Sequence, residues 1–153
     1  MRRAVLFVCL GNICRSPLAE AAFRKAADEA GLDVVIDSAG TGDWHIGEAP
    51  DRRAQATAWR HGVDISALRA RQIGVPDFDR FSHIFALDRD NLEAIRALAP
   101  DTLAADIALL LDVVPGREGE GVADPYYGDD EGFEITWSDV SQAAAALVER
   151  FSR

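Results

Sequence analysis

The residues best suited to chemistry lie near the N-terminus, in the run Val8-Cys9-Leu10-Gly11-Asn12-Ile13-Cys14-Arg15-Ser16-Pro17. Cys9 ends an apolar segment, and Arg15 follows after a loop of five residues, 10 to 14. A thiolate is a strong nucleophile, and a guanidinium group can bind two phosphate oxygens at once. A cysteine and an arginine at this spacing therefore suit thiolate attack on a bound phosphate group.

The residues between Cys9 and Arg15 are those that a tight anion cradle needs. Gly11 and Asn12 tolerate a left-handed backbone. If a strand ends at Cys9 and a helix begins near Pro17, free N–H groups of the loop and first helical turn converge on an anion, and the helix dipole adds to the attraction. The same positive field favours the thiolate form of Cys9. We therefore predict Cys9 and Arg15 as catalytic residues, with a phosphate-binding loop made of Leu10, Gly11, Asn12, Ile13, Cys14 and Ser16.

Apolar periodicity predicts the elements that must position this loop. Continuous apolar runs predict strands at Ala4–Cys9, Val34–Ser38, Ser82–Leu87 and Ala105–Leu110. Helical spacing predicts helices at Pro17–Ala30, Asp51–His61, Asn91–Ala99 and Phe133–Phe151. Gly31 and Gly62 stand where helices end, and Asp88 suits an N-cap. Residues 115 to 132 predict a long loop rich in glycine and acidic residues.

The alternation of strands and helices predicts an α/β fold, with one domain over residues 1–153. Right-handed crossovers and short connections favour a four-stranded parallel sheet of order 2-1-3-4, with helices on both faces and the phosphate loop after strand 1. Ligands of such sheets bind beyond the carboxyl ends of the strands. The Cys9 loop is predicted to leave the sheet at that edge.

Charge and hydropathy exclude several classes of partner. The net charge of −10 argues against a nucleic-acid partner. No apolar run approaches the length that spans a membrane, and the polar loop interrupts the N-terminal apolar run too early for a signal peptide. We therefore expect no membrane partner and a cytoplasmic protein.

The chain has two cysteines, Cys9 and Cys14, both in the same loop. A zinc site needs more ligands, and none of the three histidines neighbours the loop in sequence, so no metal is expected. A reversible Cys9–Cys14 disulfide can form under oxidation, which would make Cys14 a redox partner. In the alternative interpretation, Cys14 only packs beneath the loop.

The run from Cys9 to Pro17 resembles the signature loop of the low-molecular-weight protein tyrosine phosphatases. Further segments fit the same family: Asp37-Ser38-Ala39-Gly40-Thr41, Asp43-Trp44-His45, Ala70-Arg71-Gln72, Leu87-Asp88 with Asn91-Leu92, and Asp124-Pro125-Tyr126-Tyr127-Gly128. The resemblance implies hydrolysis of phosphotyrosine through a cysteinyl-phosphate intermediate, without metal or organic cofactor. It implies tyrosine-phosphorylated proteins as partners, a tyrosine kinase among them, and phosphate and other oxyanions as inhibitors.

The leaving group of such a reaction needs a proton donor, and Asp124 is the candidate. Pro125 restrains Asp124 to extended geometry. On the loop alone, Asp129, Asp130 and Glu131 compete for this role, and a solvated acidic face is the simpler interpretation of those three. The resemblance implies that the aspartate of the Asp-Pro motif is the general acid and later the base.

The resemblance also suggests a supporting shell and a rim. The Ser16 hydroxyl can cap a helix or hydrogen-bond to the Cys9 sulfur, and the family implies the second. Asn12 and Ser38 resemble members of a network that rigidifies the loop, but Leu68 stands where vertebrate members have a histidine of that network. Loop aromatics predict a rim that accepts a phenyl phosphate, formed by Trp44, Tyr126 and Tyr127.

Several other residues receive no chemical role. Trp59 and Trp137 are interpreted as helix packing residues, and Asp88 as a structural residue. A thiolate held by its loop needs no histidine base, so none is assigned to His45, His61 or His83.

Two functions of other kinds remain as alternatives. A thiol-dependent arsenate reductase shares this loop in related proteins, but its chemistry relays oxidation through downstream cysteines, and this chain has none after Cys14. A non-catalytic phosphate-binding or regulatory module would not need the intact set of Cys9, Arg15 and Asp124. A dinucleotide-binding domain is disfavoured because the loop lacks the Gly-x-Gly-x-x-Gly pattern.

Overall fold

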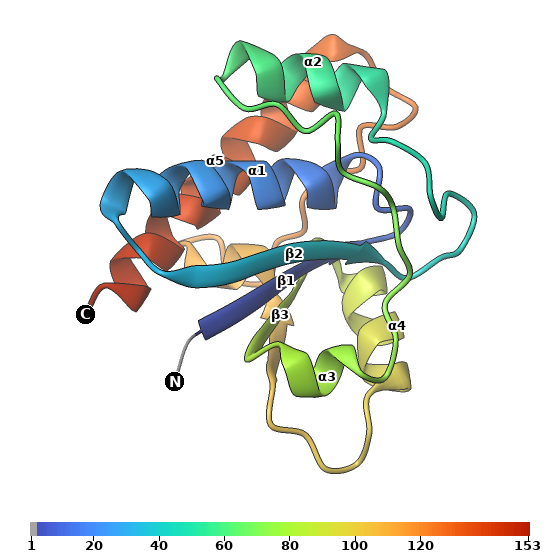
Figure 1. The fold of residues 1–153 in the computed structure, drawn as a ribbon, viewed down its shortest axis with the longest axis vertical. Helices are drawn as coiled ribbons and strands as arrows, with labels where there is room; N and C mark the ends of the chain where they lie inside the picture. The colour runs from blue at the N-terminus through green and yellow to red at the C-terminus, as the bar shows by residue number, and fades with distance from the viewer. Residues whose placement is uncertain (1–2) are drawn as a thin grey trace.

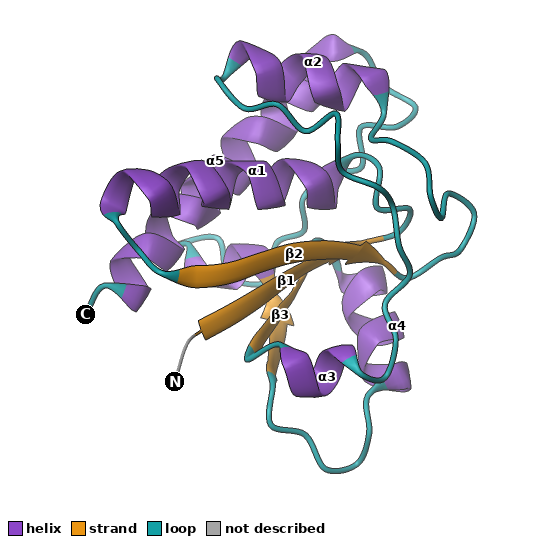
Figure 2. Cartoon of the chain, in the orientation of Figure 1, coloured by secondary structure: helices purple, strands orange, loops and turns teal. Residues whose placement is uncertain are grey.

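The computed structural model describes residues 3–153 and contains a four-stranded parallel sheet (Figures 1 and 2). The strand order is β2-β1-β3-β4, as predicted. All four predicted strands are confirmed, with bounds shifted by one or two residues: β1 Arg3–Cys9, β2 Val34–Gly40, β3 His83–Ala86 and β4 Asp106–Leu109. The phosphate loop, residues 10–14, leaves the carboxyl end of β1.

The four predicted helices are also present, namely α1 Arg15–Ala30, α2 Arg52–Arg60, α4 Arg89–Leu98 and α5 Asp130–Phe151. Two short elements were not predicted, the helix α3 Asp77–Arg80 and the 3-10 helix η1 Leu110–Val113. Each has four residues, too few to show a helical period in the sequence. Helix α1 begins two residues earlier than predicted, so Arg15 itself lies in its first turn.

Helices cover both faces of the sheet, because successive side chains of β1 point to opposite sides. Val5, Phe7 and Cys9 belong to the apolar cluster formed with α1 and α5. Leu6 and Val8 belong to the second cluster, which contains residues of α3 and α4. Figure 1 shows α1 and α5 on one side of the sheet and α3 and α4 on the other.

The predicted helix ends are confirmed by their backbone and capping contacts. Gly31 ends α1 in the left-handed region, with φ of 67°, and Gly62 has φ of 89° just after the C-cap of α2. The Asp88 side chain caps α4 by accepting a hydrogen bond from the Asn91 N–H at 2.8 Å. No helix within residues 3–153 combines the length and the apolar character that crossing a membrane requires.

The two tryptophans interpreted as packing residues differ in the structure. Trp137 is buried and stacks on His61, with ring centroids 4.7 Å apart. Trp59 is 69% exposed, so its assignment to helix packing is wrong. The buried face of α2 is formed by the small residues Ala54, Thr57 and Ala58, and Trp59 lies outside it.

The register of β1 and β2 brings the start of the phosphate loop onto the end of β2. Cys9 pairs with Gly40. A Cβ atom at Gly40 would lie 2.8 Å from the Leu10 carbonyl oxygen and 3.2 Å from Asn12. Position 40 therefore needs glycine so that the loop can rest on the strand end.

Candidate active site

The phosphate loop contains one residue with a left-handed backbone. Asn12 has φ of 58° and is the one non-glycine residue with positive φ among residues 3–153. Gly11 does not adopt that conformation, so the sequence argument for its presence is wrong. A Cβ there would lie 3.0 Å from His45 Cδ2, so a larger residue would have to displace the His45 ring slightly.

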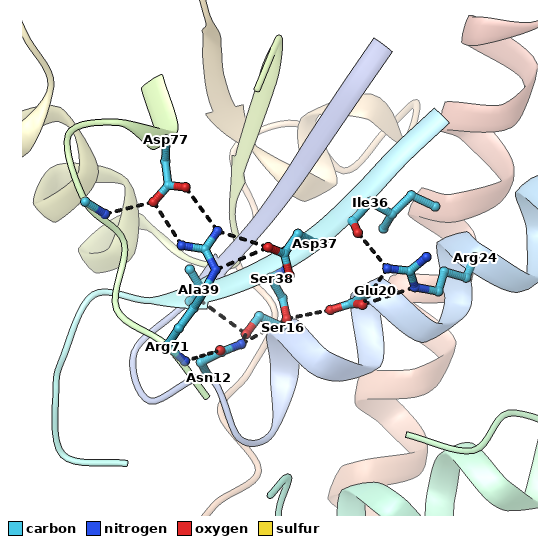
Figure 3. A network of polar contacts seen from close by, with 11 residues as sticks. Asn12, Ser16, Glu20, Arg24, Ile36, Asp37, Ser38, Ala39, Arg71 and Asp77 are labelled. Atoms are coloured by element: carbon cyan, nitrogen blue, oxygen red, sulfur yellow. Dashed lines mark hydrogen bonds and ion pairs between the residues drawn. The ribbon is translucent and has the colours of Figure 1, made fainter. Parts of the chain in front are cut away.

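A network of hydrogen bonds centred on Asn12 reaches the Cys9 sulfur through Ser16. Figure 3 shows the part of this network from Glu20 to Ser16. The Ser38 hydroxyl donates to the Glu20 carboxyl group at 2.7 Å and accepts from Asn12 Nδ2 at 3.0 Å. Asn12 Nδ2 also donates to Ser16 Oγ at 2.7 Å. Ser16 Oγ lies 3.1 Å from Cys9 Sγ and 3.5 Å from the Ala39 carbonyl oxygen, so the sulfur is the nearer acceptor for its proton. The arrangement therefore suits stabilisation of a thiolate.

Glu20 was missed by sequence reasoning, since a charged residue inside a helix usually faces solvent. It is 2% exposed and also binds Arg24, whose guanidinium donates to the Ile36 carbonyl at 2.6 Å. Burial raises the pKa of Glu20, although hydrogen bonds from Ser38 and Arg24 partly oppose that change.

A second support holds Asn12 from the other side of the loop. The Arg71 N–H donates to Asn12 Oδ1 at 3.0 Å. The Arg71 guanidinium contacts Asp77 through two hydrogen bonds of 3.1 Å and Asp37 through one of 3.2 Å (Figure 3). The short helix α3 thus anchors the phosphate loop through Arg71. Leu68 packs against the apolar core.

Arg15 is almost fully buried and is held by three groups from distant parts of the chain. Its Nη1 lies 2.6 Å from Asp88 Oδ2 and 3.1 Å from the Val122 carbonyl oxygen. Its Nη2 lies 3.4 Å from Asp124 Oδ2. Burial alone would lower the pKa of Arg15, but the Cys9 sulfur and the two carboxylates outweigh it and raise that pKa. The guanidinium is therefore a permanent and oriented cation.

Asp88 makes two contacts. Its Oδ2 binds Arg15, and its Oδ1 accepts the hydrogen bond from the Asn91 N–H that caps α4. Both contacts fit its interpretation as a structural residue, because the contact with Arg15 orients the guanidinium. Its place at the carboxyl end of β3, two strands from the sheet edge formed by β2, follows from the sheet order.

Cys14 is a buried free thiol on the same loop as Cys9. Burial is the largest cause that raises the pKa of Cys14, and the nearby Asp51 and Cys9 raise it further. Cys14 thus stays a neutral thiol and does not compete with Cys9 as nucleophile. Its role as a redox partner stays a prediction.

A cavity of about 280 Å³ opens above the phosphate loop, with Cys9, Arg15 and Asp124 in its lining. Its walls are formed by residues of the loop and of two other segments: Leu10, Ile13, Trp44, His45, Tyr126 and Tyr127. All three predicted rim residues therefore meet at one cavity. Tyr127 is 96% exposed, and its ring meets that of Tyr126 edge-on with centroids 4.9 Å apart. The walls suit a flat aromatic group that ends in a phosphate.

The acid loop, residues 124–128, is a compact turn. Asp124 Oδ1 accepts a hydrogen bond from the Tyr126 N–H at 3.1 Å, and the Gly128 N–H donates to the Pro125 carbonyl at 2.9 Å. The competing carboxylates serve the following helix. Asp129 caps α5, and Asp130 and Glu131 lie in its first turn, where acidic residues favour the helix dipole.

Gly42 sets the position of the Trp44 wall. A Cβ at residue 42 would lie 1.9 Å from Trp44 Cζ3, so the indole ring packs directly on the glycine. We expect Gly42→Ala to displace the ring and raise KM for phosphotyrosine several-fold, with an unchanged inhibition constant for inorganic phosphate. Steady-state kinetics with phosphate as competitor measure both. An equal change in the two constants would contradict a role confined to the wall.

Comparison with known proteins gives a consistent result over nearly the whole chain. Residues 4–153 match the family model described as low molecular weight phosphotyrosine protein phosphatase. A low molecular weight protein-tyrosine-phosphatase of Streptomyces coelicolor is 44% identical over 153 residues, covering 97% of this chain and 93% of that protein.

Two solved structures extend the comparison. The crystal structure of YfkJ from Bacillus subtilis is 38% identical, with a TM-score of 0.92 over 99% of this chain and 96% of that one. That of DARP, a Drosophila arginine phosphatase, is 31% identical, with a TM-score of 0.92 over 100% of this chain and 99% of that one.

Proposed function

This chain belongs to the low molecular weight phosphotyrosine protein phosphatase family, and from that premise we propose that Cys9, Arg15 and Asp124 carry its reaction. The protein is a protein tyrosine phosphatase, and we propose phosphotyrosine groups and phosphate-like oxyanions as its ligands. The proposal concerns the residues that perform each step and the substrates that the site accepts.

In the first step, the Cys9 thiolate attacks the phosphorus atom of an aryl phosphate. A sulfur–phosphorus bond forms while the bond from phosphorus to the phenolic oxygen breaks. Arg15 and the N–H groups of the loop hold the non-bridging oxygens, where charge must be stabilised. Asp124 donates its proton to the departing phenolate.

In the second step, the Asp124 carboxylate takes a proton from a water molecule, whose oxygen attacks the phosphocysteine. The sulfur–phosphorus bond breaks, inorganic phosphate forms, and Cys9 leaves as a thiolate. The Ser16 hydroxyl, 3.1 Å from Cys9 Sγ, can donate a hydrogen bond to that thiolate. The same network that prepares the nucleophile thus assists its departure.

The observation that carries these assignments is the meeting of three distant segments at one cavity. Cys9, Arg15 and Asp124 all line it, and Arg15 Nη2 lies 3.4 Å from Asp124 Oδ2. A phosphate group held by Arg15 above Cys9 would therefore have the Asp124 carboxyl group on its leaving-group side.

The walls favour tyrosine phosphate over other phosphorylated side chains. Leu10, Ile13, Trp44 and Tyr126 present apolar or aromatic surface, which a phenyl ring covers more fully than a short serine side chain does. The aliphatic contacts of Leu10 and Ile13 also favour an uncharged phenyl ring over a charged guanidinium. One solved relative is an arginine phosphatase, so phosphoarginine is the competing substrate to test. We propose tyrosine-phosphorylated proteins as partners, with an autophosphorylated tyrosine kinase as one class.

The test compares hydrolysis of phosphotyrosine, phosphoserine and phosphoarginine by the reduced protein, with and without EDTA. We expect turnover of phosphotyrosine that EDTA does not change, because the proposed steps use only side chains and water. Phosphoserine should be hydrolysed far more slowly. Faster hydrolysis of phosphoarginine would overturn the substrate assignment, and loss of activity with EDTA would overturn the proposed steps.

A further inference from the structure

The second residue of α2, Arg53, connects the two loops that form the active site. Sequence analysis gave it no role, since an arginine near a helix start usually faces solvent. Its Nη1 donates to the Gly128 carbonyl at 3.0 Å, and its Nη2 donates to the Tyr126 carbonyl at 2.8 Å. Both acceptors belong to the acid loop. In Figure 1 the segment before α5 passes beside α2.

Asp51 fixes this guanidinium from the other side. Asp51 Oδ1 accepts from Arg53 Nε at 3.1 Å, and Oδ2 accepts from Nη2 at 3.0 Å. Burial opposes ionisation of Asp51, but the hydrogen bonds from the Arg53 side chain and backbone outweigh it and lower the pKa of Asp51. The guanidinium also lies 4.7 Å from the ring centroid of Phe133 on α5. Its fork is therefore locked in one orientation.

The backbone of Asp51 reaches the phosphate loop. Its N–H donates to the Ile13 carbonyl oxygen at 2.8 Å. The N-terminus of α2 thus contacts the loop that holds the nucleophile through Asp51 and the loop that holds the acid through Arg53. Three hydrogen bonds between Arg53 and Asp51 join these two contacts, so the link is short.

The backbone of Tyr126 connects Arg53 to Asp124. The carbonyl of Tyr126 accepts from Arg53, and its N–H donates to Asp124 Oδ1 at 3.1 Å. Fixing both backbone groups of Tyr126 orients the Asp124 carboxyl group relative to the Cys9 loop. The side chain of Asp124 is 44% exposed, and its other oxygen, Oδ2, lies 3.4 Å from Arg15 Nη2.

We propose that Arg53 is a positioning residue that holds the acid loop at the distance from the phosphate loop which proton donation by Asp124 requires. The proposal rests on the assignment of Asp124 as general acid. Arg53 does not touch the reacting atoms and acts through the backbone of Tyr126 and Gly128. Its loss should therefore affect the proton transfers that Asp124 performs and leave the thiolate and the phosphate loop unchanged.

Leaving-group dependence separates this role from a general structural one. Phenyl phosphate needs protonation of its leaving oxygen, whereas 2,4-dinitrophenyl phosphate releases a stable anion without it. For Arg53→Gln we expect kcat/KM with phenyl phosphate to fall at least about tenfold, since small misplacement of a catalytic group is costly. With dinitrophenyl phosphate the change should stay within about twofold. Arg52→Gln, which removes the same charge from the exposed neighbour on α2, should leave both substrates unaffected.

A double variant tests whether Arg53 acts through Asp124. In an Asp124→Ala background, Arg53→Gln should change kcat/KM for phenyl phosphate by less than about twofold, because the acid is already gone. The inhibition constant of inorganic phosphate and the melting temperature report whether the Arg53→Gln protein is folded and keeps its phosphate loop.

Four outcomes would overturn the proposal. Equal losses with the two substrates would assign Arg53 a general structural role. Additive losses in the double variant would show action independent of Asp124. If Asp124→Ala itself showed no leaving-group dependence, the assignment of the acid would fail together with the proposal. A normal Asp124→Ala response with an unchanged Arg53→Gln would overturn the Arg53 proposal alone.

Discussion

Replacing Cys9 with serine is expected to reduce turnover of para-nitrophenyl phosphate by at least about 10⁴-fold, which is the scale of losing an essential nucleophile. A serine hydroxyl would have to lose its proton during the attack. Within residues 3–153 no histidine or carboxylate is hydrogen bonded to Cys9; its side-chain partner is the Ser16 hydroxyl. The site stabilises an anion already formed, and among these residues no base is hydrogen bonded to position 9 to create one. Steady-state kinetics of wild type and Cys9→Ser measure the effect.

The control for this variant is retention of phosphate binding. Serine is close to cysteine in size, and Arg15 stays held by Asp88 and the Val122 carbonyl. Inorganic phosphate should therefore raise the melting temperature of Cys9→Ser as it does for wild type. If Cys9→Ser still binds phosphate and keeps more than about one hundredth of the wild-type turnover, Cys9 is not the nucleophile.

Replacing Asp124 with alanine is expected to lower kcat/KM for phenyl phosphate by roughly 10²- to 10⁴-fold, the usual contribution of a general acid. The acid must carry its proton while Cys9 has lost its own, so the wild-type protein should work best at mildly acidic pH. The fall in activity toward alkaline pH should then disappear in Asp124→Ala. The pH dependence of kcat/KM for the two proteins measures this directly.

Glu131→Ala is the matched control, because it removes an exposed carboxylate from the first turn of α5, close to the acid loop. It should keep the wild-type rate and pH profile. A wild-type profile in Asp124→Ala, or the loss of the alkaline limb in Glu131→Ala, would assign the acid to another residue.

Those parts of the fold that depend on regular apolar spacing could be predicted from the sequence. The apolar run of β1 has residues for both faces of the sheet, and its six predicted residues are all buried in the structure. The start of α5 was predicted three residues late at Phe133, because the Asp129 cap and the two acids after it show no apolar period. The elements α3 and η1 were not predicted because four residues are too few to show an apolar period.

The candidate site was predictable where a residue's role follows from its own loop. Cys9, Arg15 and the phosphate loop form one continuous segment, so their meeting needed no knowledge of the fold. Asp124 was assigned through the family resemblance, since four carboxylates of one loop have similar local patterns. The structure distinguishes them by their partners: Asp124 contacts Arg15, whereas Asp129 caps a helix.

The supporting residues were missed because their partners are distant in sequence. Glu20 has the pattern of a solvated helix residue, and only its contact with Ser38 explains its burial. Arg53 contacts carbonyl groups 73 and 75 residues away. A backbone carbonyl group can accept a hydrogen bond whatever the side chain of its residue is. Such contacts therefore cannot be inferred from composition or spacing.

The contact between Arg15 and the Val122 carbonyl spans 107 positions of the chain and has a consequence for biosynthesis. A ribosome delivers the cysteine loop first, but the Val122 carbonyl, Asp124 and helix α5, which packs with α1 in one apolar cluster, emerge near the end. A nascent chain that stops before Val122 therefore exposes the nucleophile without the Val122 contact to Arg15 and without an acid. We expect phosphatase activity to begin only when translation is nearly complete. Polysomes that carry unfinished chains should therefore release no phosphate from phosphotyrosine.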